Sequence, residues 1–311
     1  MSHRDWYYSL HGALSVLYYT AQTSSKIRQE RGRKCEFDIT QNDIRHLWDS
    51  QDGKCYYSGI PMNYDRNDWR VSLERTDTQQ GYTKKNIVLC CLEFNSRVQW
   101  SKFKVYEMLS ILDSNIKENY VDFELPLKEH KKRGKVKNTK KEIEGIMHCM
   151  CNHCKGFKPL TEFYTHPDQG CKECCNIRRK LYSATPRGAL TNLLRNSKLA
   201  TRIRAQKSNG NKDTTYDLNF QFLVELYNKQ KGLCAYSGLP LQFGSSLDKN
   251  WVASLERKNT FKGYTTDNVC LICAEFNTND QSVKLNNPKL GNGGWTADKF
   301  LVFYNSIKAS F

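Results

Sequence analysis

One block of this chain occurs twice, and the repeat limits the possible folds more than any other feature of the sequence. The segment SLERTDTQQGYTKKNIVLCCLEFN at residues 72–95 returns without a gap as SLERKNTFKGYTTDNVCLICAEFN at residues 254–277, with 14 of 24 positions identical. The shared positions are mostly polar or conformationally special, whereas a repeat kept only for folding would keep its apolar face. Two copies are too few for a solenoid. The sequence therefore indicates two equivalent sites in one chain.

The repeat extends beyond this block, and a cysteine-rich segment separates the two copies. GKCYYSGIPM precedes the first block, and GLCAYSGLPL precedes the second. A helical pattern follows each block, from Trp100 and from Trp295, with Ser101 and Thr296 as predicted N-caps. We predict four regions: a first half at 1–120, a basic linker at 121–147, a zinc-binding module at 148–182 and a second half at 183–311.

The charge of the chain predicts a polyanionic partner. Its 48 Lys and Arg residues against 32 Asp and Glu residues give a formal net charge of +16, which favours nucleic acid over a membrane. No apolar run approaches the roughly 18 residues that a membrane span requires, so we expect no membrane. Six of the 13 cysteines crowd between Cys149 and Cys175, mostly in CxxC pairs. That pattern favours metal binding in a reducing compartment, cytoplasmic or nuclear, over secretion.

Three basic stretches are candidates for phosphate contact. The run HKKRGKVKNTKK at 130–141 carries seven Lys or Arg residues and favours a solvated linker, with phosphate contact or a nuclear import signal as the functional alternatives. The stretches at 25–34 and 197–207 occupy matched places in the two copies. Positive charge in register with each copy suits phosphate binding, although a solvated helix face is the alternative. The candidate DNA-binding residues are Arg28, Arg31, Arg202 and Arg204.

The cysteine-rich segment predicts a structural zinc site. Its two CxxC pairs stand 16 residues apart, the spacing at which four thiolates close a tetrahedral Zn²⁺ site. A closed shell leaves no open coordination position, so the ion would hold together a segment too small for its own core. The predicted ligands are Cys151, Cys154, Cys171 and Cys174, with Cys149, His153 and Cys175 as spares.

The repeated block has the pattern strand, loop, strand, helix. We predict strands at 69–73 and 87–91, a loop at 74–86 and a helix from Leu92. This order, together with the form SLxRxDxxxGYTxxN, resembles the HNH nucleases with a ββα-metal fold, in the variant found in phage and restriction enzymes. The resemblance implies an α+β chain with two tandem ββα-metal domains that form a pseudo-dimer, and with a four-cysteine zinc module between them.

The resemblance also implies which residues act in each copy. In the family, an acid at the end of the first strand and an Asn in the first turn of the helix hold one divalent cation, and a middle Asn fixes the loop. Oxygen ligands of this kind suit Mg²⁺ or Mn²⁺. By match, the metal ligands are Glu74 with Asn95 and Glu256 with Asn277, and the middle residues are Asn86 and Asn268.

The chain departs from the family at the general base. Arg75 and Arg257 occupy the place of the usual His, and a guanidinium cannot take a proton from water. All seven histidines lie at or before position 166, so the second half contains none. Tyr82 and Tyr264 are therefore the candidate bases, since a nearby Arg and a cation both favour phenolate, and the Arg residues would hold the scissile phosphate. A water activated by the cation alone is the alternative.

A second departure concerns cysteines. Many HNH nucleases carry a zinc-binding CxxC at each end of the block, but here the second Cys of each pair is replaced. We expect the remaining thiols to be small buried apolar groups, although Cys35 and Cys90 leave a rebuilt site open in the first half. The altered pairs are Cys55 with Ser58, Cys91 with Phe94, Cys234 with Ser237 and Cys273 with Phe276.

These features together predict a metal-dependent endonuclease acting on double-stranded DNA as a monomeric pseudo-dimer. Each half would hydrolyse one strand, and two diverged copies can read an asymmetric target because matched symmetry is no longer enforced. The sequence leaves open a non-catalytic nucleic-acid-binding protein, a nicking enzyme with one dominant site and an RNA-directed nuclease. It does not separate restriction, homing and viral genome processing.

Overall fold

The described part of the chain folds as a mixed α+β protein with three small antiparallel sheets, which confirms the predicted class at this coarse level. The computed structural model describes residues 6, 9–33, 35–65, 68–95, 98–114, 139–165, 167–207, 213–246, 248–277 and 294–309.

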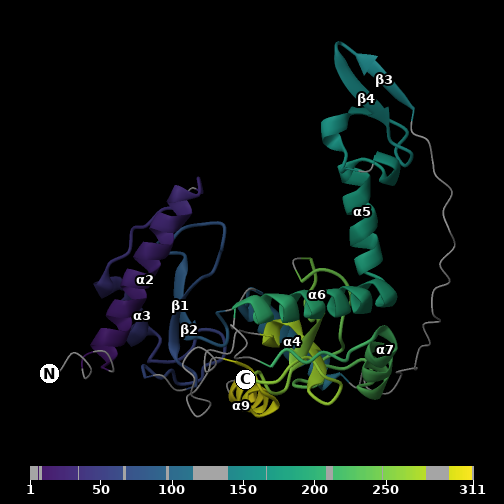
Figure 1. The fold of residues 1–311 in the computed structure, drawn as a ribbon. Helices are drawn as coiled ribbons and strands as arrows, with labels where there is room; N and C mark the ends of the chain where they lie inside the picture. Colours follow the sequence, from purple (N-terminus) through teal and green to yellow (C-terminus); the bar gives the residue numbers. More distant parts are fainter. Residues whose placement is uncertain are drawn as a thin grey trace.

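Two halves of matching element order precede and follow the cysteine-rich central module along the chain, and the module projects from the second half (Figure 1). Short polar side chains cap the helices: Ser9 caps α2 (Leu10–Glu30), and Thr40 forms a capping box with Asp43 on α3 (Gln41–Ser50). As predicted, Ser101 caps α4 (Lys102–Asp113), and Thr296 caps α9 (Ala297–Lys308). The first half contains α2 (Leu10–Glu30), α3 (Gln41–Ser50), β1 (Val71–Arg75), β2 (Ile87–Cys91) and α4 (Lys102–Asp113). The second contains α6 (Pro186–Lys207), α7 (Phe220–Lys229), β6 (Ala253–Arg257), β7 (Val269–Cys273) and α9 (Ala297–Lys308).

Each half carries one two-stranded hairpin in the same register. Glu74 pairs with Val88 across β1 and β2, and Glu256 pairs with Cys270 across β6 and β7. Because side chains alternate along a strand, Glu74 shares its face with Ser72 and not with Leu73. Both β2 and β7 are buried along their whole length.

The predicted helix from Leu92 is wrong. Residues 92–94 form a tight turn, and the equivalent Ala274–Phe276 is a single 3₁₀ turn, η4. The N–H of Asn95 reaches only three residues back, to the Leu92 carbonyl, and the glutamate of each turn bonds a distant backbone N–H. These contacts fix a turn, so the first helix that the structure describes after each of these turns is α4 (Lys102–Asp113) or α9 (Ala297–Lys308).

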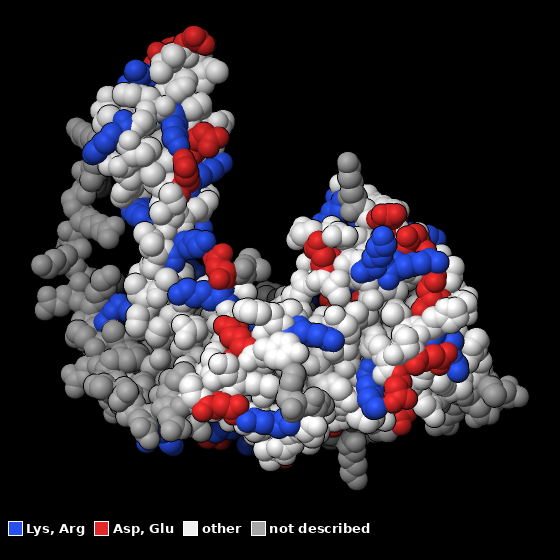
Figure 2. Space-filling model, turned by 180° about the vertical axis from the view of Figure 1, so that it is seen from behind, with Lys and Arg blue, Asp and Glu red and all other residues white. Residues whose placement is uncertain are grey.

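The central module stands away from the rest of the molecule on α5 (Lys172–Ser183), as Figure 1 shows. It begins earlier than the predicted boundary at 148, because β3 (Lys140–Ile143) pairs with β4 (Ile146–Met150), which pairs with β5 (Phe157–Pro159). Residues 130–138 of the basic run lie outside the described residues. Figure 2 shows a deep notch between the central module with α5 and the first half, with basic and acidic side chains interspersed on the visible face.

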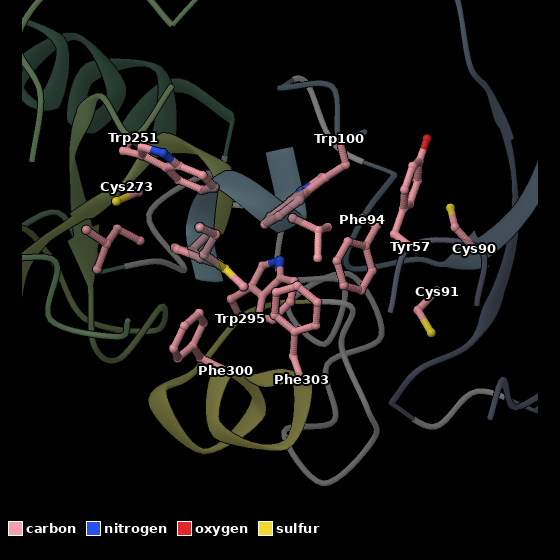
Figure 3. Close-up of a cluster of buried hydrophobic side chains, with 14 of the residues drawn as sticks. Tyr57, Cys90, Cys91, Phe94, Trp100, Trp251, Cys273, Trp295, Phe300 and Phe303 are labelled. Atoms are coloured by element: carbon pink, nitrogen blue, oxygen red, sulfur yellow. The ribbon is translucent and has the colours of Figure 1, made fainter. Parts of the chain in front are cut away.

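The two halves share one hydrophobic core. Buried residues from both hairpins and from α4 and α9 belong to a single cluster, whose centre is aromatic (Figure 3). The rings of Trp100 and Trp295 lie 6.2 Å apart, and Phe303 of α9 lies 5.7 Å from Trp100 and 5.0 Å from Phe94. The halves therefore form one folded unit, and each C-terminal helix packs across the boundary.

Within the described residues, no helix combines the length and apolar character needed to cross a membrane.

Candidate active site

Glu74 lies at the end of β1 as a buried acid. Its side chain has no hydrogen bond or ion pair within the described part of the chain, and burial raises its pKa from 4.5 to about 7. A carboxylate in such a place is costly unless a cation compensates its charge. The position is therefore unfavourable in isolation and favourable for cation binding.

The side chain of Asn95 is held against the same strand. Its Nδ2 donates to Ser72 Oγ at 2.9 Å and to the Leu73 carbonyl at 3.0 Å. Asn277 donates in the same way to Ser254 Oγ and the Leu255 carbonyl. Because the nitrogen of each amide already donates hydrogen bonds to the strand, the Oδ1 oxygen is the atom that can bind a ligand.

Two buried asparagines close the loops between the strands. Asn86 Oδ1 accepts from the Asp77 backbone N–H at 2.8 Å and from Thr76 Oγ1, and Asn86 Nδ2 donates to the carbonyls of Asp77 and Gly81. Asn268 makes equivalent bonds to the backbone of Asn259 and Gly263. Both residues thus hold their loops through hydrogen bonds to the backbone.

The arginines that follow Glu74 and Glu256 bind these loops. Arg75 Nη1 donates to the carbonyls of Thr78 and Gln80, and its guanidinium carbon lies 5.1 Å from the centre of the Tyr82 ring. In the second half Arg257 donates to the carbonyls of Thr260 and Lys262 and lies 5.1 Å from the centre of the Tyr264 ring. The arginine and the tyrosine of each half are therefore neighbours.

Two of the four arginines that the sequence predicts as DNA contacts, Arg28 and Arg204, form hydrogen bonds to these same loops. Arg28 of α2 donates through Nη2 to the Thr78 carbonyl at 3.2 Å, and Arg204 of α6 donates to the Thr260 carbonyl at 2.8 Å. Burial lowers the pKa of Arg204, and the charge of Arg257 lowers it further. Arg31 and Arg202 are exposed. Each of the two basic stretches at equivalent positions, 25–34 and 197–207, thus contains one arginine that binds a loop between strands.

Tyr82 departs from the expected tendency towards phenolate. Burial raises its pKa, the charge of Glu74 raises it further, and Arg28 opposes both. The neighbouring Arg75 lies over the ring face. The charges of Glu74 and Arg28 thus shift the Tyr82 pKa in opposite directions.

The loop of Tyr82 docks closely on the chain that leads to α3. Tyr82 N–H donates to the Glu36 carbonyl at 3.0 Å, and a Cβ added at Gly81 would lie 1.9 Å from that oxygen. Gly263 meets the Thr215 carbonyl in the same way, at 2.1 Å. Glycine is required here for close backbone approach.

The two halves differ in the surroundings of the acid. Glu256 is half-buried, whereas Glu74 is buried. Cys270 pairs with Glu256 across the hairpin, where the first half has Val88. Burial raises the pKa of Cys270 to about 12, and the Glu256 charge contributes. The second site thus has a more polar and more open environment.

The cysteines beside the hairpins are buried, as expected. Cys55 Sγ accepts the Cys91 N–H at 3.3 Å, and Cys234 Sγ accepts the Cys273 N–H at 3.3 Å. Within the described residues, the one group of three or more His, Cys, Asp or Glu side chains close enough to share an ion lies elsewhere, in the central module. A rebuilt metal site with Cys35 and Cys90 is therefore absent from the described part of the first half.

The central module brings the four predicted thiols together. The Sγ atoms of Cys151, Cys154, Cys171 and Cys174 all lie within 4.8 Å of one another. Four thiolates on a zinc ion at about 2.3 Å stand about 3.8 Å apart, so the set fits a tetrahedral ion after slight contraction.

The backbone around these thiols favours their ionised form. The Cys171 N–H donates to Cys151 Sγ at 3.2 Å. Burial alone would raise the pKa of Cys151, but hydrogen bonds from the backbone of Cys171, Cys154 and His153 lower it to about 6. A Cβ at Gly170 would lie 2.6 Å from the His153 ring, so this turn requires glycine as well.

Sequence reasoning missed Glu93 and Glu275. Both have 0 % exposure, and their carboxylates accept the backbone N–H of Trp69 and Trp251, which both have a φ of 61°. The glutamate is identical in the two copies, and this was the available signal. The lysine partner of each glutamate comes from the other half, Lys299 for Glu93 and Lys104 for Glu275, and comparison of the two copies alone does not reveal it.

Neither protein-family profiles nor curated proteins nor solved structures yield a match to this chain.

Proposed function

We infer that the chain is a metal-dependent DNA endonuclease of the HNH type, with one ββα-metal-like site in each half. The observation that carries this proposal is the buried Glu74 carboxylate, which has a raised pKa and lies at the end of β1, the strand to which the Asn95 amide is bound. The same pairing of acid and amide recurs at Glu256 and Asn277. A solitary buried acid whose environment raises its pKa is typical of a functional site.

The cation would be held by Glu74 with Asn95, and by Glu256 with Asn277. Carboxylate and amide oxygens suit Mg²⁺ or Mn²⁺, and water and substrate phosphate complete the coordination of such ions. In a nuclease the cation stabilises the negative charge that develops on the phosphate and its leaving oxygen.

The remaining residues would orient the phosphate and accept a proton. Asn86 and Asn268 hold the loops in place through their backbone bonds. Arg75 uses Nη1 for the loop, and a guanidinium has further N–H donors that can reach a phosphate. Tyr82 Oη is the candidate base of the first half, because neutralisation of Glu74 removes one of the causes that raise the Tyr82 pKa.

Two such sites fused in one chain would cut the two strands of one duplex. The shared core fixes the halves relative to each other, as the interface of a homodimer does. The divergence of the halves suits an asymmetric target. The four-cysteine module would hold a structural Zn²⁺, and the positive charge of the chain favours double-stranded DNA as partner.

Cleavage of DNA by single-site variants tests this function. The protein is incubated with genomic DNA and supercoiled plasmid in Mg²⁺, and the new ends are sequenced. The wild type is expected to leave breaks at a defined sequence. Glu74→Ala and Glu256→Ala are expected to leave nicks in opposite strands, and the double variant should leave none. Glu225→Ala, a change at an exposed acid of α7, is the matched control. Wild-type cutting by all three site variants would refute the assignment.

The same assay separates the alternatives. A non-catalytic binding protein would retain DNA on a gel with and without EDTA and would leave no new ends. An RNA-directed nuclease would degrade structured RNA in a parallel digestion and leave duplex DNA intact. A nicking enzyme would lose all activity in one single variant and none in the other.

A further inference from the structure

Two buried ion pairs cross the boundary between the halves in opposite directions. Lys104 of α4, in the first half, lies 2.7 Å from Glu275 in the second. Lys299 of α9, in the second half, lies 2.8 Å from Glu93 in the first. Both lysine side chains are at least nine-tenths buried, and both glutamates are fully buried. Lys104 and Lys299 hold equivalent positions, four residues after Trp100 and Trp295.

Each of these glutamates joins the two segments that form a candidate metal site. Glu93 Oε1 accepts the N–H of Trp69, two residues before β1, and Glu93 itself lies two residues before Asn95. In the second half, Glu275 Oε1 accepts the N–H of Trp251, and Glu275 precedes Asn277 by two residues. In each half, one glutamate thus belongs to the turn that leads to the candidate metal-binding asparagine. Its carboxylate also holds the backbone just before the strand that carries the candidate metal-binding glutamate.

These glutamates depend on their lysine partners. Trp69 and Trp251 adopt the left-handed conformation, which costs energy in a bulky residue unless the surroundings hold it. The second oxygen of each carboxylate, Oε2, is buried and has no hydrogen-bond partner among the described residues. A buried carboxylate in this state requires the lysine charge, because removal of one partner of a buried pair leaves an uncompensated ion.

We propose that each candidate active site is completed by the other half of the molecule. Lys299 acts as a positioning residue for Asn95, and Lys104 acts as a positioning residue for Asn277, each through the intervening glutamate. The inference rests on the proposed function, which gives the two asparagines their role as metal ligands. It adds that neither half can assemble its site alone, so the two sites are coupled through α4 and α9.

The environments of the two lysines differ in detail. Lys299 Nζ also lies 2.6 Å from Asp68 Oδ1 and donates to the Gly294 carbonyl, whereas Lys104 Nζ lies 5.7 Å from the Trp100 ring centre and 5.2 Å from the Trp251 ring centre. Replacement of Lys299 therefore removes more contacts to oxygen atoms than replacement of Lys104 does. We expect the Lys299 change to have the larger effect on metal binding, and this effect falls on the first site.

Manganese binding to the full-length chain tests the crossing. In a Glu74→Gln background only the second site binds Mn²⁺, and in a Glu256→Gln background only the first. Lys104→Met is expected to weaken Mn²⁺ binding about tenfold in the Glu74→Gln background and to leave it unchanged in the Glu256→Gln background. Lys299→Met should give the opposite pattern. Isothermal titration or the loss of the free-Mn²⁺ resonance measures the affinities.

Controls separate positioning from general damage. Lys102→Met, at an exposed position of α4, should leave both affinities unchanged, and Lys104→Arg should restore most of the binding lost in Lys104→Met. If Lys104→Met does not fold, Lys104→Met/Glu275→Gln removes the unpaired charge and is expected to fold with the second site still weakened.

The outcomes distinguish this inference from the function on which it rests. No Mn²⁺ binding by the wild type would overturn both. Binding of two ions by the wild type would overturn the inference alone if the lysine variants had no effect, affected both sites equally, or affected the site of their own half.

Discussion

Glu74 is the residue on which the candidate chemistry of the first half depends. Its raised pKa means that a proton occupies the carboxylate up to about pH 7 in the folded chain, compared with 4.5 when unperturbed. A cation and a proton compete for the same oxygen atoms. The pH dependence of metal binding should therefore report this single group.

We predict that the Mn²⁺ affinity of the first site, measured in the Glu256→Gln variant, rises about tenfold per pH unit between pH 5.5 and 6.5 and becomes constant above about pH 7.5. Titration calorimetry in a pH series measures it. An affinity that is already constant at pH 6 would contradict the raised pKa.

The same group should make the metal-free protein less stable at high pH. Because the folded-state pKa is above the unfolded value, the stabilising contribution is complete below pH 4.5 and is lost as pH rises through 7. At pH 8 the free energy of unfolding of Glu74→Gln should therefore exceed that of the wild type by up to about 3 kcal/mol. The variant should accordingly unfold at a higher urea concentration. At pH 4 the two should be alike. A less stable variant at pH 8 would show that Glu74 already has a compensating partner.

At the scale of elements, the loop between the strands depends on its docking against the segment before α3. Gly81→Ala places a methyl group against the Glu36 carbonyl, at 1.9 Å before relaxation. We predict a loss of about 2–4 kcal/mol in the free energy of unfolding, measured by denaturant titration. In Gly156→Ala the added Cβ would meet only Cys154 Sγ, at 3.8 Å, and a change within about 0.5 kcal/mol is expected. Equal effects of the two changes would argue against close docking of this loop.

The four-cysteine module should release one zinc ion per chain. Titration with an organomercurial in the presence of a zinc dye is expected to release about one equivalent from the wild type. None is expected from Cys154→Ser, which removes one of the four thiols. Cys149→Ala is the matched control, because Cys149 is buried in the same module but lies outside the set of four. Full zinc release from Cys154→Ser would show that one of the other sulfur or imidazole groups replaces Cys154.

At the scale of the whole molecule, the shared aromatic core predicts one cooperative unfolding transition for the two halves. Phe303 has 0 % exposure and contacts aromatic rings from both halves. Phe303→Ala should cost about 3–5 kcal/mol and lower the stability of both halves together. Phe103→Ala, at a residue with 75 % exposure, should change it by less than about 0.5 kcal/mol. Separate transitions for the two halves in urea would contradict a common core.

Much of this arrangement could be predicted from the sequence, and the remainder could not for physical reasons. The hairpins, the caps at Ser101 and Thr296 and the cluster of four thiols follow from local patterns. The turn at Leu92 was missed because Glu93 bonds a backbone amide 24 residues earlier and a lysine more than 200 residues later. The loop-binding role of Arg28 was missed for a similar reason, since its acceptor lies 50 residues away. Contacts of such long range leave no periodic signal.

The central claim is that each half holds a divalent cation between a strand-end glutamate and an asparagine in the following turn. The most direct test is a crystal soaked in MnCl₂, with diffraction data collected at the manganese absorption edge. Two anomalous peaks are predicted, one between Glu74 and Asn95 and one between Glu256 and Asn277. The absence of a peak from both pairs would contradict the account.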